Sequence, residues 1–316
     1  MPTAIDHLAD ASIELSPIGS LSDPQRCTRL GNTLVAIQGT DERTLVRANL
    51  DAPSPVWTPI AKDVFGDDSV GPVAIADATH GRLLVASLSS VWLLEIDHAG
   101  TTKTLREWDL HSETSTPISI SLAADSSGDV LAMVERERVY RMSPDSQERA
   151  IRFSDPHFSR VCVSPRGDVI ATSREDGRVE ICDATTLSVL RNLDGLGATV
   201  LAMAFSPDGR KLAAADDTTR AFVWDLDTGT SRRLDGVAKI VRFEWTADGS
   251  GLVSISLTRH LAAWDLADPN AEWHPRSDRH FHDLGPRYFI DGIRIDDSRF
   301  AVVIERTGVY MARFTP

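Results

Sequence analysis

The 316-residue sequence predicts an all-β fold made of repeated four-stranded units, on three observations. A turn followed by an apolar run recurs as GNTLVAI at Gly31, GRLLVAS at Gly81, GDVLAMV at Gly128, GDVIATS at Gly167, GRKLAAA at Gly209, GSGLVSI at Gly249 and SRFAVVI at Ser298. Successive copies start 50, 47, 39, 42, 40 and 49 residues apart, close to the roughly 40–45 residues of one propeller blade. Fifteen residues after four of these turns come Ile96-Asp97, Cys182-Asp183, Trp224-Asp225 and Trp264-Asp265. The sequence therefore predicts one domain over residues 1–316, a seven-bladed β-propeller of four-stranded antiparallel blades.

The fifth copy shows the unit most completely. Residues 205–229 read FSPDGRKLAAADDTTRAFVWDLDTG, which contains two apolar strands separated and flanked by polar turns. Two strands cannot bury an apolar face alone, so each unit must pack against its neighbours in a ring. Small residues in VAIADA (73–78), ISISLAA (118–124) and LAMAF (201–205) fit the innermost strands, which crowd around the axis.

The last unit lacks one strand. After Ser298 the chain has room for two more strands, whereas SIELSPI (12–18) alternates apolar and polar residues as a half-buried strand does. We predict that residues 12–18 complete blade 7 and close the ring, which removes exposed strand edges. The alternative is an N-terminal arm outside the sheet.

The spacing between Ser-Pro-Asp-Gly and Trp-Asp resembles the WD40-repeat family, most clearly in blades 4 to 6. This resemblance implies a propeller that binds proteins. The family's Gly-His dipeptide is replaced by Gly195-Leu196 and Gly236-Val237, so the hydrogen-bonded network built on that histidine is expected to be absent there. Asp176 keeps the family's turn aspartate without its histidine partner, and blade stability should depend more on apolar packing.

Composition excludes several classes of protein. The net charge of −13 disfavours binding to nucleic acid. The start MPTAIDHLADASIEL lacks a secretion signal, and no apolar stretch is long enough for a membrane span. Three cysteines in or beside apolar runs predict buried free thiols in the cytoplasm. Of the 33 basic residues four are lysine and the rest arginine, a composition that favours a GC-rich bacterial genome. As a separate prediction, we expect the protein to be a monomer.

The sequence contains no catalytic, nucleotide-binding or CxxC motif, so we predict no enzyme activity and no cofactor. The alternative is a metal-assisted hydrolase near the channel mouth, built on His280, His282 and Asp283 with His274 upstream. Three arginines in HPRSDRHFHDLGPR disfavour a cation there.

The predicted function is a non-catalytic protein-interaction module that acts as a scaffold, adaptor or inhibitor through its loop-bearing face. Three long connections, at 61–72, 109–117 and 274–287, should lie in one sector of that face. They offer apolar anchors, acids that favour a basic partner and two histidines: Val64, Phe65, Phe281, Asp63, Asp67, Asp68, Asp109, Glu113, Asp283, His280 and His282. The alternative is that these loops are tolerated insertions with their aromatics tucked inward.

A second set of candidates opens the third strand of blades 3 to 6: Arg138, Arg178, Arg220 and His260. Equivalent positions in successive blades would form an arc of cationic groups on the same face. The alternative is that each pairs locally with Glu137, Asp176 or Asp217 in its own turn, at little gain in stability.

Overall fold

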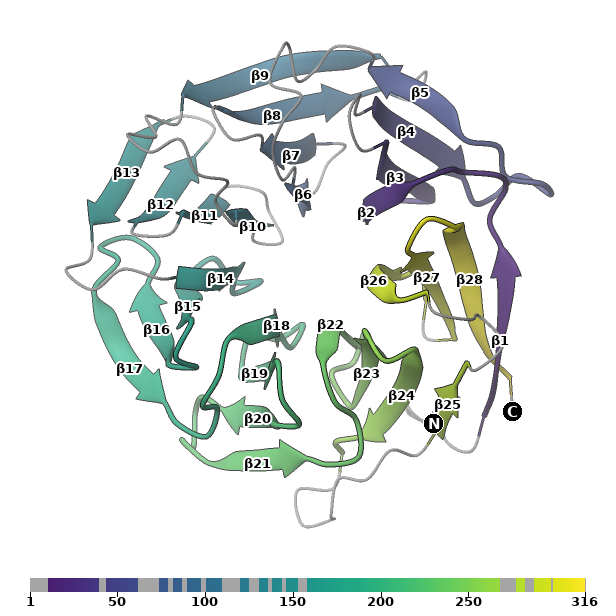
Figure 1. Ribbon diagram of the computed structural model, residues 1–316. Coiled ribbons are helices and arrows are strands. Elements are labelled where there is room, and N and C mark those ends of the chain that lie inside the picture. The colour runs from purple at the N-terminus through teal and green to yellow at the C-terminus, as the bar shows by residue number, and fades with distance from the viewer. Residues whose placement is uncertain are drawn as a thin grey trace.

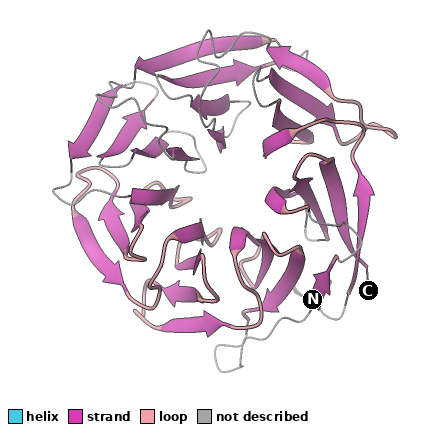
Figure 2. Cartoon of the chain, in the orientation of Figure 1, coloured by secondary structure: helices cyan, strands magenta, loops and turns pink. Residues whose placement is uncertain are grey.

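The computed structural model describes residues 11–39, 44–61, 74–78, 82–86, 90–97, 101–109, 120–124, 131–135, 138–143, 146–152, 158–267, 277–281, 287–296 and 298–315. Within these residues all regular secondary structure is β-strand, and the strands are arranged around a central axis (Figures 1 and 2). No helix long and apolar enough to cross a bilayer is present in this part of the chain.

The described strands form seven four-stranded antiparallel sheets, which we number as blades in chain order. Blade 1 contains β2 (Pro24–Leu30), β3 (Thr33–Gln38), β4 (Thr44–Asn49) and β5 (Thr58–Ala61). Blade 2 contains β6 (Ala74–Ala78), β7 (Arg82–Ala86), β8 (Ser90–Ile96) and β9 (Thr102–Asp109). Blade 3 contains β10 (Ile120–Ala124), β11 (Leu131–Glu135), β12 (Arg138–Ser143) and β13 (Ser146–Arg152).

The remaining blades follow the same order from the innermost to the outermost strand. Blade 4 contains β14 (Phe158–Val163), β15 (Val169–Arg174), β16 (Val179–Asp183) and β17 (Val189–Leu193). Blade 5 contains β18 (Val200–Phe205), β19 (Lys211–Asp216), β20 (Ala221–Asp225) and β21 (Ser231–Leu234). Blade 6 contains β22 (Ile240–Trp245), β23 (Gly251–Ser256), β24 (His260–Asp265) and β25 (Ser277–His280). Blade 7 contains β26 (Phe289–Arg294), β27 (Arg299–Ile304), β28 (Gly308–Thr315) and β1 (Ser12–Pro17).

The innermost strands contact one another in sequence around the axis, from β2 through β6, β10, β14, β18 and β22 to β26, which contacts β2. This arrangement confirms the all-β class and the propeller of four-stranded antiparallel blades. Apolar clusters lie between neighbouring blades, as between blades 5 and 6, where Val223 and Ala213 pack with Trp264 and Leu252. Each blade therefore buries its faces against the next one.

Blade 7 is assembled from both ends of the described chain. Strand β1 pairs antiparallel with β28, in a register that runs from Ser12 opposite Thr315 to Pro17 opposite Tyr310. The Ile13 side chain is 2% exposed and packs in one apolar cluster with Phe300 and Phe314. The N-terminal strand thus supplies the outermost strand of the blade that contains the C-terminal strands.

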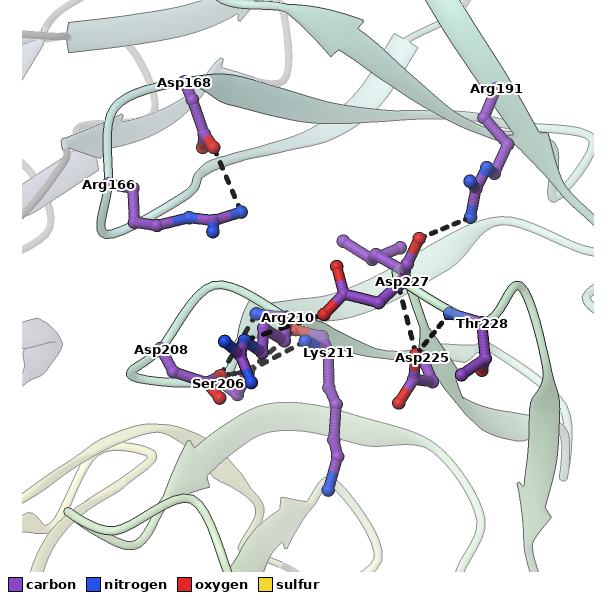
Figure 3. A network of polar contacts seen from close by, with 11 residues as sticks. Arg166, Asp168, Arg191, Ser206, Asp208, Arg210, Lys211, Asp225, Asp227 and Thr228 are labelled. Atoms are coloured by element: carbon purple, nitrogen blue, oxygen red, sulfur yellow. Dashed lines mark hydrogen bonds and ion pairs between the residues drawn. The ribbon is translucent and has the colours of Figure 1, made fainter.

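The turns between the first and second strands depend on a hydroxyl at the first turn position. In blade 5 the Ser206 hydroxyl donates to Asp208 Oδ1 at 2.6 Å and accepts the Lys211 N–H at 2.9 Å. Gly209 adopts a positive φ of 69°, which explains why glycine follows the aspartate. Figure 3 shows this turn beside Arg166, Asp168 and Arg191 of blade 4.

The Trp-Asp dipeptide has a separate role for each residue. Trp224 is 3% exposed in the apolar cluster between blades 4 and 5, and its indole Nε1 donates to the Asp194 carbonyl oxygen at 3.0 Å. Asp225 accepts the Thr228 N–H at 2.8 Å, and this bond, aided by the Thr228 hydroxyl and the Asp227 N–H, lowers the pKa of Asp225 against the effect of burial. The tryptophan packs the blade and the aspartate shapes the next turn.

The aliphatic residues that stand where the family has histidine pack against apolar clusters. Val237 is buried in the cluster between blades 5 and 6, and Leu196 packs against the cluster between blades 4 and 5. The structure adds polar contacts that the sequence reasoning missed. Asp216, 1% exposed, accepts the Gly197 N–H at 3.3 Å, and the Ser256 hydroxyl donates to the Ala238 carbonyl. Side chains that end the second strand of blades 5 and 6 thus hydrogen-bond to the connection that precedes each blade.

The cysteines are free thiols, with Cys27 and Cys182 buried and Cys162 partly buried. Burial raises the pKa of all three thiols, that of Cys182 to about 11 with help from the Glu180 charge. We expect the native protein to react with a disulfide reagent at pH 8 at least about a hundredfold more slowly than the guanidinium-unfolded chain, because thiolate is the nucleophile. A thiol that reacts rapidly before unfolding would contradict this placement.

Candidate interaction face

Antiparallel pairing within each blade puts two kinds of loop on one face of the ring. They are the connections from an outermost strand to the next innermost strand, and the turns between second and third strands. We call this the loop-bearing face. Its main described parts are residues 17–24, 174–179, 193–200, 216–221, 234–240, 256–260, 287–289 and 304–308. The turns drawn in Figure 3 belong to the opposite face.

Hydrogen bonds join the connections to the turns on the loop-bearing face. In the connection between blades 4 and 5, the Thr199 hydroxyl donates to the Glu175 carbonyl at 3.2 Å and the Thr199 carbonyl accepts the Asp217 N–H at 2.9 Å. In the next connection, the Lys239 N–H donates to the Thr218 carbonyl at 3.1 Å. These bonds run from blade to blade, so this part of the face is a continuous hydrogen-bonded surface.

Gly177 shows how closely a turn and a connection approach. It adopts a positive φ of 88°, and a Cβ added there would lie 2.7 Å from the backbone nitrogens of Gly197 and Ala198. Only glycine fits this contact without a shift of the backbone. The Arg220 guanidinium lies against Gly197 in the same way, because a Cβ there would lie 2.5 Å from Arg220 Nη1.

The cationic arc has a different environment in each blade. Arg178 pairs with Asp176 through Nε and Oδ2 at 2.7 Å, with both side chains about half exposed. Burial opposes ionisation of Asp176, but the Arg178 N–H and guanidinium lower the pKa of this carboxyl. This local pair is the alternative considered for blade 4, and it contributes little stability because it is exposed.

The other members of the arc lie at the positions expected from their register. Arg220 is exposed and precedes β20, and Arg138 opens β12, although its side chain is outside the described residues. His260 opens β24 directly opposite His280 of β25, and their rings stack with centroids 4.4 Å apart at 14°. The two stacked rings form a compact, partly buried edge to blade 6.

Most of the predicted loop sector lies outside the described residues, namely Asp63, Val64, Phe65, Asp67, Asp68, Glu113, His282 and Asp283. Asp109 ends β9, and its side chain is likewise outside the description. Their grouping into one site therefore stays a prediction.

Phe281 requires a correction. It was expected to be an exposed apolar anchor, but it is 3% exposed and packs against Phe289 with ring centroids 5.7 Å apart. The Arg279 guanidinium lies 4.8 Å from its ring centroid. Neighbouring charges suggested a solvated loop, whereas Phe281 fills the space between blades 6 and 7, as the inward-facing alternative proposed.

Sequence reasoning missed Tyr288, the exposed aromatic on this connection. Its side chain is 51% exposed, and its carbonyl accepts the Glu305 N–H at 2.9 Å from the turn of blade 7. Arg287 beside it is also exposed. The signal was its position at the start of an innermost strand, immediately before the buried Phe289.

Comparison with known proteins places this geometry in a family context. The family model described as WD domain, G-beta repeat, matches residues 187–225. The 66 kDa stress protein of Physarum polycephalum is 30% identical over 115 residues, 35% of this chain and 19% of that protein. WD repeat-containing protein SL1-17 of Schistosoma mansoni is 30% identical over 34% of this chain and 36% of its own length.

The mouse WD repeat-containing protein 1 is 26% identical over 152 residues, which are 46% of this chain and 25% of that protein. The chain thus matches well under half the length of each of these relatives. The matched repeat ends at the Trp224-Asp225 dipeptide that the structure places at the end of a third strand. Repeat, relatives and ring of four-stranded sheets together identify this chain as a WD40-repeat β-propeller.

Proposed function

We propose that the chain is a single-domain, non-catalytic protein-interaction module that holds a protein partner on its loop-bearing face. The general role of a protein-interaction scaffold is the one that its WD-repeat relatives suggest. More specifically, we propose that the chain acts in the cytoplasm as an adaptor or inhibitor. The surface of its partner is basic where that surface meets the acidic loops that lead into blades 2 and 3.

One observation carries the proposal. The turns and connections of blades 4 to 6 are joined by hydrogen bonds into one surface, on which Arg178 and Arg220 are exposed. The exposed Tyr288 lies on the connection into blade 7, on the same face. A rigid surface loses little conformational entropy on binding, and exposed tyrosine and arginine are the side chains most enriched at binding hot spots. The surface therefore has the physical properties of a docking face.

The metal-assisted hydrolase gains no support from the described residues. His280 stacks on His260, which uses its ring face for packing. No group of three or more histidine, cysteine, aspartate or glutamate side chains is arranged for a metal in the described parts of the chain. His282 and Asp283 lie outside them, so no observation favours this function over the module.

The test compares two triple variants by quantitative crosslinking in lysate of the source cells. Arg178→Glu, Arg220→Glu and Tyr288→Ala alter the loop-bearing face with two charge reversals. Arg166→Glu, Arg191→Glu and Arg210→Glu alter the opposite face with three, so the control carries the larger change in charge. We expect the first set to reduce capture of the wild-type partner at least about tenfold, since each hot-spot residue contributes about 1–2 kcal/mol. The second set should leave capture unchanged.

Retention of the partner by the loop-bearing variant, or its loss from the opposite-face variant alone, would contradict the assignment of the face. Both variants must first show the wild-type melting temperature. The substituted side chains are solvent-exposed or on turns, so each triple variant should fold.

A further inference from the structure

Arginine residues gather where the innermost strands meet near the axis. Each of five described innermost strands has a register irregularity close to its first residue, next to the connection that enters the blade. The residues that resume pairing after it are equivalent in blades 1, 4, 5, 6 and 7: Arg26, Arg160, Ala202, Arg242 and Asp291. Each follows the connection that enters its blade, so these residues lie at the end of the axis that opens on the loop-bearing face.

The side chains reach from blade to blade. Arg160 Nε of blade 4 donates to the Leu201 carbonyl of blade 5 at 3.0 Å. Arg26 Nη1 of blade 1 donates to the Ile290 carbonyl of blade 7 at 3.5 Å. Both acceptors are the irregular residues just before the equivalent position of the neighbouring blade. The guanidinium groups therefore lie along the inner wall of the ring.

Two carboxylates belong to the same cluster. Glu244 Oε1 accepts Arg242 Nε at 2.7 Å. Asp291, which is 4% exposed, accepts the Cys27 N–H at 3.1 Å. Among these five ionised side chains, Arg26, Arg160, Arg242, Glu244 and Asp291, the positive charges exceed the negative ones. This local excess lies inside a chain whose net charge is −13.

The charges act on one another across the ring. Burial lowers the pKa of Arg160 most, and the positive charge of Arg26, three blades away, lowers it further, to about 10. The negative charge of Asp291 opposes this effect. Burial works against the charge of Arg242, but Glu244 and Asp291 raise the pKa of its guanidinium. Arg26 and Arg160 thus repel each other, and a bound anion between them would relieve that repulsion.

Solvent reaches this cluster. Arg26 is exposed, Arg160 is partly exposed, and the Arg242 side chain keeps 38% of its surface accessible although β22 is an innermost strand. A ligand from solution can therefore contact the guanidinium groups from the axis. A planar guanidinium group can donate two parallel hydrogen bonds to the oxygens of a phosphate group, which it cannot do to a spherical monovalent ion such as chloride.

We propose that Arg26 and Arg160, supported by Arg242, bind a phosphate group of a small multivalent anion at the axial mouth of the ring. The site goes beyond the proposed protein-docking role and does not depend on it. Free phosphates and a phosphorylated peptide share this chemistry, and the carboxylates Glu244 and Asp291 limit the site to one such group.

The test is isothermal titration of the purified full chain with pyrophosphate, with sodium chloride used to hold ionic strength constant. Wild-type protein should bind saturably, and Arg26→Gln and Arg160→Gln should each weaken binding about tenfold, as loss of one charge-assisted contact does. Asp291→Asn should tighten binding several-fold, because it removes an opposing charge while its amide oxygen can still accept the Cys27 N–H. Arg210→Gln on the opposite face is the matched control and should bind as the wild type does.

Weaker binding by the arginine variants together with tighter binding by Asp291→Asn indicates that these side chains form a binding site. A purely structural role would not change the affinity in opposite directions. Absence of saturable binding by the wild type, or equal binding by Arg26→Gln and the wild type, would overturn the proposal. If Arg160→Gln unfolds, the exposed Arg26 and the conservative Asp291→Asn change still decide it. A phosphoserine peptide titrated in parallel identifies the source of the phosphate: tighter binding than pyrophosphate indicates a protein ligand and weaker binding a free anion.

Discussion

Deletion of residues 1–20 should abolish cooperative folding or leave an aggregating chain, because it removes β1 from blade 7. The deletion uncovers the whole backbone edge of β28, and because it removes Ile13 it exposes Phe300 and Phe314 of the same apolar cluster. Burial of Ile13 and Ile18 alone corresponds to about 3–6 kcal/mol, a large part of the roughly 5–15 kcal/mol that stabilises most domains. Thermal unfolding and size-exclusion chromatography of the truncated chain measure the effect.

Two variants sharpen this prediction. A chain that lacks only residues 1–10 keeps β1 and should melt as the full chain does. Ile13→Ala in the full chain should cost about 2–5 kcal/mol as a buried large-to-small change. A monomeric truncated chain with the melting temperature of the full chain would show that β1 is dispensable for the ring.

Trp224→Ala is expected to destabilise the protein by about 3–5 kcal/mol, because it empties a packed site between blades 4 and 5 and removes a hydrogen bond. The indole is 3% exposed and touches the cluster that contains Val179, Leu212 and Phe205. Denaturant titration followed by circular dichroism measures the change in the free energy of unfolding. Unchanged unfolding would mean that Trp224 is not a core residue and that the register of the blades is wrong.

Phenylalanine substitutions at two equivalent tryptophans separate packing from hydrogen bonding. Trp224 Nε1 donates to the Asp194 carbonyl, whereas Trp264 Nε1 is buried without an acceptor among the described residues. We expect Trp224→Phe to cost about 0.5–1.5 kcal/mol more than Trp264→Phe, the net contribution of one hydrogen bond. Equal costs would show that the Asp194 contact contributes nothing.

The sequence specifies the blades because their turns and cores obey local rules. The Ser-Pro-Asp-Gly turn requires a hydroxyl, a carboxylate and a positive φ within four residues, so Ser206 and Gly209 predict its place. Trp224 follows at a fixed distance because the second strand must cross the blade before the third returns. The pairing of residues 12–18 with blade 7 could also be predicted from the sequence, because a count of the strands left blade 7 one strand short.

The candidate site was less predictable because it depends on contacts between distant segments. The burial of Phe281 follows from the position of Phe289 in the next blade, which periodicity in a charged loop does not reveal. The axial arginines sit in short inner strands where alternation predicts apolar residues, and only the ring brings Arg26 and Arg160 together. The burial of Asp216 was not predicted, because Gly197, whose N–H it accepts, belongs to a separate connection.

Pairing of β1 with β28 also determines when the protein can finish folding during its synthesis. Ser12 and Thr315 lie 303 positions apart, so β1 leaves the ribosome almost the whole chain before its partner exists. Until β28 is made, β1 and the flank of blade 1 stay without their native neighbours, and bringing such distant segments together is slow. Nascent chains with unpaired strand edges are prone to associate with one another. The yield of native protein in cells is therefore expected to depend on how quickly this contact forms once β28 has been synthesised.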